Sequence, residues 1–167
     1  MFVLVSLISK DYLDAKPALA TLSDAIARCE QLGSLLLCVP LDVRDAADVR
    51  IPPAAFFFFA RVLLCAMERL TGLRSLVITF RRIMPSAAGL DTIFGNCPVT
   101  QTAVLRALDK IFVASQHPQK IVIICRCQSE KGPRRVAVPK ALEEIMPLTC
   151  SAGRLRYIVL GCGEQAN

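Results

Sequence analysis

The sequence has no tryptophan, only one histidine and two tyrosines, and charged residues make up just 20% of it. With His117 as the only imidazole, the chain is poorly equipped for a zinc site or for general acid–base catalysis. It has no Cys-x-x-Cys pair, and no glycine-rich phosphate-binding motif follows its first apolar segment. We therefore expect no catalytic residue, no metal ion, no cofactor and no small-molecule substrate.

The chain also lacks an apolar run long enough to span a bilayer. The longest, Ile51 to Met67, is interrupted by Arg61 and is shorter than the about 20 residues that a membrane helix needs. Residues 2–9 are apolar like the middle of a signal peptide, but no positive residue precedes them and Lys10 and Asp11 follow at once. We therefore expect an intracellular protein, cytoplasmic or nuclear, with no membrane segment.

Eight cysteines are present, an even number that in a short secreted chain would suggest disulfides. Cys38, Cys65 and Cys125, however, lie inside apolar runs, where cysteine behaves as a small buried hydrophobic residue. We expect reduced thiols, as is usual inside the cell.

Length and composition predict one well-packed domain over residues 1–167. Hydrophobic residues make up 54% of the chain and the mean hydropathy is +0.49, so some apolar surface is expected to face a partner. The net charge of +6 suits an acidic partner or nucleic acid. The basic clusters, at Arg81–Arg82 and in the loop 128–140, have no interleaved aromatic residues, so nucleic acid is not favoured.

Five short apolar runs rich in strand-forming residues alternate with segments of helical spacing. This alternation predicts an α/β fold, a three-layer α/β/α sandwich with a mostly parallel central sheet and helices on both faces, similar to Rossmann-like proteins. The predicted strands are Phe2–Ile8, Ser34–Val39, Leu73–Phe80, Lys120–Cys125 and Leu155–Leu160.

Four helices are predicted between these strands, at about 15–32, 53–70, 99–115 and 139–147. In the third, Leu108 and Phe112 belong to an apolar stripe, and Asp109 is expected to face solvent. The segments 42–51 and 84–98 have no clear period and are expected to be loops.

The second half of the chain has a recognisable order of motifs. Gly95–Ala103 leads into an amphipathic helix, Pro118–Cys127 contains a strand, and Arg156–Gly163 ends in Gly-Cys-Gly. This stretch, about 95–163, resembles the closing βα units of von Willebrand factor A-type domains. The resemblance implies that Leu73–Phe80 is the family's strand ending in Thr/Ser-Phe and that Phe2–Ile8 is its first strand.

The family's metal site uses an Asp-x-Ser-x-Ser loop after the first strand, a threonine from a middle loop and an aspartate after a later strand, because a hard divalent cation prefers oxygen ligands. Here the first loop reads Ser6–Lys10, and Arg126 stands in place of the later acid. Another register, Leu41–Asp45, restores one acid but adds Arg44. The resemblance thus implies a degenerate metal site, and members without the metal are generally structural or interaction subunits.

Four successive phenylalanines, Phe56 to Phe59, span more than one face of a helix. One interpretation, which we favour slightly, is a helix covered on two sides. The alternative is that Phe56 or Phe59 is displayed to a partner chain.

The sequence therefore predicts a non-catalytic interaction or scaffolding subunit of an intracellular multiprotein complex, with other protein subunits as partners. Two alternatives stay open: a Rossmann-like hydrolase or transferase with dispersed site residues, which a pocket near His117 would favour, and a basic nucleic-acid-binding module. The candidate partner-binding residues are Ser9, Lys10, Thr100, Arg126, Lys131, Arg134, Arg135, Phe56 and Phe59.

Overall fold

A computed structural model describes residues 2–6, 28, 32–43, 49–84, 89–115, 117–128 and 133–161. In this part of the chain, six strands form one sheet in the order β1-β2-β5-β6-β8-β7, and only the β7–β8 pair is antiparallel. The predicted α/β fold with a mostly parallel sheet is confirmed. The strands are β1 (Phe2–Ser6), β2 (Ser34–Val39), β5 (Ser75–Met84), β6 (Lys120–Cys127), β7 (Pro133–Val136) and β8 (Leu155–Gly161).

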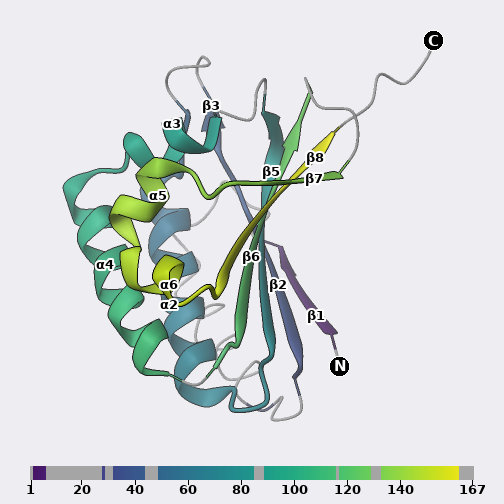
Figure 1. The fold of residues 1–167 in the computed structure, drawn as a ribbon, viewed down its shortest axis with the longest axis vertical. Helices are drawn as coiled ribbons and strands as arrows, with labels where there is room; N and C mark the ends of the chain where they lie inside the picture. Colours follow the sequence, from purple (N-terminus) through teal and green to yellow (C-terminus); the bar gives the residue numbers. More distant parts are fainter. Residues whose placement is uncertain are drawn as a thin grey trace.

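The parallel strands follow one another across the sheet in the order in which they occur along the chain. From one parallel strand to the next, the chain from β2 onward therefore always advances in the same direction, with β7 added beyond β8 at the edge. Right-handed crossovers that all step in one direction place their helices on the same face of a sheet. Figure 1 shows this arrangement, with the described helices gathered on one side. The helix predicted over 15–32 lies outside the described residues except for Arg28 and Leu32.

Two of the predicted helices are confirmed nearly to the residue, at 53–70 and 99–115. The segment predicted as one helix over 139–147 is instead two short helices, because Pro147 begins a new helix and does not end the first. The described helices are α2 (Pro53–Arg69), α3 (Gly89–Gly95), α4 (Val99–Ala114), α5 (Lys140–Ile145) and α6 (Pro147–Ser151).

Three elements lie where the sequence predicts loops. Strand β7 lies within the expected basic loop 128–140 and pairs with β8. Helix α3 lies within 84–98 and buries Ile93 and Phe94. A short hairpin, β3 (Asp42–Val43) with β4 (Val49–Arg50), occupies the expected loop 42–51, where the Asp42 carboxylate lies 3.8 Å from Arg50 Nε.

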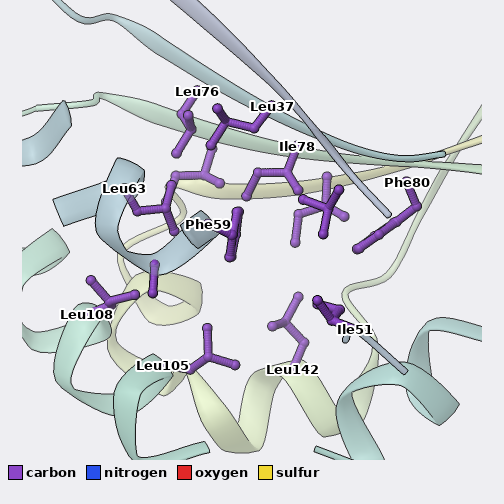
Figure 2. Close-up of a cluster of buried hydrophobic side chains, with 14 of the residues drawn as sticks. Leu37, Ile51, Phe59, Leu63, Leu76, Ile78, Phe80, Leu105, Leu108 and Leu142 are labelled. Atoms are coloured by element: carbon purple, nitrogen blue, oxygen red, sulfur yellow. The ribbon is translucent and has the colours of Figure 1, made fainter. Parts of the chain in front are cut away.

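The core lies between the sheet and the helical layer. Alternate residues of each central strand are buried on the helical side, and the register aligns them across the sheet, so that Leu37, Ile78, Ile123 and Tyr157 form one row. In Figure 2, strand residues such as Ile78 and Phe80 face residues from α2, α4 and α5. Each fully buried aliphatic or aromatic side chain contributes about 1.5–3 kcal/mol through the hydrophobic effect.

A buried carboxylate joins α4 to α6. Asp109 is only 2% exposed, and its Oδ1 accepts hydrogen bonds from the Thr149 backbone N–H at 2.8 Å and the Thr149 hydroxyl at 2.5 Å. Its Oδ2 accepts one from the Leu148 N–H at 3.0 Å. The prediction that Asp109 faces solvent is wrong, because α6 packs there and its first N–H groups have no acceptor within their own helix.

A second polar contact holds the carboxyl-terminal end of α4. The Arg154 guanidinium, just before β8, donates to the carbonyl oxygens of Phe112, Ser115 and Pro118, at 2.9 Å for Ser115. Burial lowers the pKa of Arg154 from its ordinary value. A cation beside the last carbonyls of a helix complements the helix dipole. Asp109 and Arg154 together hold α4 against α6 and against the residues that lead into β8.

Candidate functional site

The face of the sheet turned away from the helices is lined by the alternate residues that the core does not use. The register places Leu36, Val77 and Val122 in one row, and Ile124 and Ile158 in the next. Val122 is buried, and the other four side chains are half-buried. We call the β2, β5, β6 and β8 residues on this side the open face. It is apolar along β6 and β8, while Thr79 of β5 lies beside Ile124, and no described helix covers it (Figure 1).

Three exposed cations border the aliphatic centre of the open face. Lys120 begins β6, Arg156 lies beside Val122 in the register, and Arg126 lies near the end of β6 beside Leu160. Of the described residues on this face, none is a carboxylate. Lys120 and Arg126 are six positions apart along β6, which at about 3.3 Å per residue places them about 20 Å apart. The open face therefore combines an apolar centre with positive charge at both ends.

The structure does not bring the predicted site residues together. Arg126 is exposed on the open face, whereas Thr100 is exposed in the first turn of α4, within the helical layer on the other side. Ser9, Lys10 and Lys131 lie outside the described residues. Arg134 and Arg135 are in β7, of which the structure describes the backbone only.

The prediction that Phe56 or Phe59 is displayed to a partner is wrong. Phe56 is fully buried and Phe59 is 6% exposed, while Phe57 is 55% exposed. The Phe56 ring contacts the other two, with centroids 6.0 Å from Phe57 and 6.5 Å from Phe59. Because successive helical residues are about 100° apart, only one member of the run faces outward once α2 packs on the sheet.

A cavity of about 30 Å³ lies inside the core, between the sheet and the helical layer. All its lining residues are apolar, among them Phe59, Leu63, Ile78 and Phe112. A space of this kind stays dry and presents no group that binds or activates a polar substrate. The cavity therefore does not favour an enzyme active site.

Burial favours the neutral forms of two thiols and one phenol near the core. Burial raises the pKa of the Cys97 thiol, which donates weakly to Gln101 Oε1 at 3.7 Å. Burial, with the nearby carboxylates of Glu143 and Asp109, raises the pKa of Cys150 to about 11. Burial also raises the pKa of Tyr157, whose hydroxyl lies near the Cys125 and Cys127 thiols. Because the thiolate is the reactive form of cysteine, such thiols are poor nucleophiles near neutral pH.

These shifts predict a loss of stability at alkaline pH. The unfolded chain ionises Tyr157 above about pH 10, whereas the folded chain keeps it neutral, so the free energy of unfolding falls as the pH rises past this value. Cys150 acts in the same direction between about pH 9 and 11. We expect the fall between pH 9 and 11, measured by urea denaturation, to be shallower in Tyr157→Phe than in the unmodified chain. Equal slopes would show that Tyr157 ionises normally in the folded state.

Among the described residues, no group of three or more histidine, cysteine, aspartate or glutamate side chains lies close enough to hold a metal ion. None of the described helices is both long and apolar enough to cross a membrane. In comparisons with known proteins, no family model, curated protein or solved structure matches this chain. The resemblance to von Willebrand factor A-type domains therefore stays a prediction from the sequence.

Proposed function

We propose that this chain is a non-catalytic protein-interaction domain, a scaffolding subunit that binds a partner protein through its open face. One observation supports the proposal above the others: half-buried aliphatic residues occupy the centre of that face, exposed cations border it, and no described helix covers it. In an α/β domain the apolar face of a sheet is stabilised by burial against another element.

The composition of the open face matches that of a protein interface. Interface centres are apolar and poor in acids and lysine, and arginine is enriched where partners meet. Val122, Ile124 and Ile158 supply the apolar centre, with Arg156 and Arg126 toward its two ends. Apolar surface with a polar border is typical of an interaction site.

The enzyme alternative receives less support. Open α/β sheets bind substrates where the order of the parallel strands reverses, and the described parallel strands contain no such reversal. His117 precedes β6, at the amino end of the strands and away from the edge that α/β enzymes use. Its N–H donates to Ser115 Oγ at 3.1 Å, and its carbonyl accepts from the same hydroxyl at 2.7 Å. These contacts tie the backbone of His117 to the Ser115 side chain.

The nucleic-acid alternative also receives less support. Proteins that bind single strands stack bases on aromatic side chains, and the described part of the open face carries none. The side chains of Arg81 and Arg82 lie outside the structure's description. No specific observation therefore favours a second function.

Substitutions on the two sides of the molecule test the proposal. We expect Ile158→Thr, and separately Arg126→Ala, to lower the recovery of co-purifying proteins from native cells about tenfold, because each removes part of the interface. Arg126 is exposed, so its substitution leaves the core intact. The matched control is Val113→Thr on α4, where the side chain is 42% exposed.

Quantitative mass spectrometry of the purified tagged chain provides the measurement, and circular dichroism confirms that each variant is folded. Loss of partners in Val113→Thr, or unchanged recovery in both open-face variants, would contradict the proposal.

A further inference from the structure

We infer that the partner element bound on the open face is an amphipathic helix with acidic residues near both of its ends, lying along β6 and β8. This inference rests on the proposed function and names the chemistry of the partner. The evidence for the acidic helix is the arrangement of charge along β6 and β8.

The charges on the open face are placed at the ends of a strand pair and not at its centre. Lys120 and Arg156 lie near the amino ends of β6 and β8, and Arg126 lies near the carboxyl end of β6. Between them the face is aliphatic, with Val122, Ile124 and Ile158 as the middle positions. A partner that buries this centre is therefore expected to bring negative charge to both ends.

The distance between the two ends fits a helix of ordinary length. The separation of about 20 Å between Lys120 and Arg126 along the strand corresponds to about 13 helical residues, at 1.5 Å per residue. This length, three to four turns, equals that of a common helix in a globular domain.

The other face of the same sheet shows that it accepts helices. Its aliphatic rows, including Leu76 with Ile121, pack against α2 and α4. The open face repeats this pattern of rows with Val77 and Val122. Helices are the elements that normally cover such a surface in mostly parallel sheets, which favours a helix over an extended segment.

Two other occupants fit less well. A second copy of the chain, docked face to face, would bring like charges together, since every described charge on the open face is positive. Nucleic acid fits less well because bases stack on aromatic side chains, and the described part of the open face has aliphatic side chains and no aromatic ones. An acidic amphipathic helix complements both the apolar centre and the cations.

Three synthetic 14-residue peptides test the inference against the full-length chain. All carry the same leucine stripe at helical spacing; the first has two glutamates at each end, the second has lysines at those positions, and the third has its glutamates in the middle. We expect the first to bind at least about tenfold more tightly than either of the others at low salt, because only it pairs with both ends of the face.

The binding site is located by nuclear magnetic resonance and by charge reversal. We expect the first peptide to shift the amide signals of β6 and β8, and the double variant Arg126→Glu/Arg156→Glu to prefer the lysine peptide. Arg106→Glu, an exposed arginine on α4, is the matched control and is expected to bind as the unmodified chain does. Equal affinity for the acidic and basic peptides, or no change in preference on charge reversal, would overturn the inference.

Other occupants are tested with the same variants. The inference is overturned if the open face binds phosphatidylserine vesicles, or a 20-nucleotide single strand, more tightly than it binds the acidic peptide. It is also overturned if the chain forms concentration-dependent dimers that Arg126→Glu strengthens. If Ile158→Thr removes the cellular partners while the peptides show no charge preference, the proposed function stands and the acidic helix is rejected. If the partners are unaffected as well, both fail.

Discussion

Replacing Phe56 with alanine is expected to lower the free energy of unfolding by about 3–5 kcal/mol, whereas Phe57→Ala should change it by less than about 0.5 kcal/mol. Phe56 is fully buried between α2 and the sheet and contacts two neighbouring rings, while more than half of the Phe57 side chain is exposed. The two substitutions remove the same atoms from adjacent positions, so the helix propensity changes equally in both. Only the burial differs.

Urea denaturation followed by circular dichroism measures both variants under the same conditions. Similar losses for Phe56→Ala and Phe57→Ala would contradict the orientation of α2 described here, and a larger loss for Phe57→Ala would reverse it.

Replacing Asp109 with alanine is expected to lower the free energy of unfolding by about 3 kcal/mol or more. The substitution leaves the buried Thr149 hydroxyl and two backbone N–H groups at the start of α6 without their acceptor. Asp109→Asn keeps one acceptor oxygen but loses the charge, so a smaller loss is expected.

Asp91 is the matched control for Asp109. It is exposed, and its carboxylate accepts one longer hydrogen bond, 3.3 Å, from the N–H of Ala141 at the start of α5. We expect Asp91→Ala to cost less than about 1 kcal/mol. If Asp109→Ala is as mild as Asp91→Ala, the buried carboxylate does not hold α6 against α4.

The sequence predicts well those helices and strands in which the buried residues recur at a regular spacing. Helix α4 is predicted because Leu105, Leu108 and Phe112 recur at helical spacing on its buried side. The central strands are predicted because each is a short apolar run. Neither pattern indicates the order of the strands across the sheet. Because that order decides on which face the connecting helices lie, the gathering of the described helices on one face is visible only in the structure.

The errors at single residues have a similar cause. Asp109 occupies a position that looks solvent-facing along α4 alone, and it is buried only because a segment 40 residues further along the chain packs there. Strand β7 begins Pro-Arg-Arg, a composition that suits a loop but also an edge strand, where proline and charge prevent further pairing. In the phenylalanine run, the sequence indicates that the rings span more than one face of the helix without indicating which ring is exposed.

The candidate site is only partly predictable for the same reason. Arg126 is a candidate from the sequence because it replaces an acid in a resembling motif, whereas the structure makes it a candidate because it lies on the open face. Lys120 and Arg156 are missed because each strand is taken to be buried on both sides. The alternation of charged and apolar residues in Arg154-Leu155-Arg156-Tyr157 is the signal that could have identified Arg156, whereas Lys120 precedes a continuous apolar run.

The most direct test of the central claim is photo-crosslinking from the open face. A benzophenone amino acid is placed at Ile158, and in a matched variant at Val113 on α4, and the tagged chain is irradiated in its native cells. The account predicts a crosslink to another protein from position 158 and none from position 113. Crosslinks to other proteins from position 113 alone, or a crosslink from position 158 only within the chain itself, would contradict it.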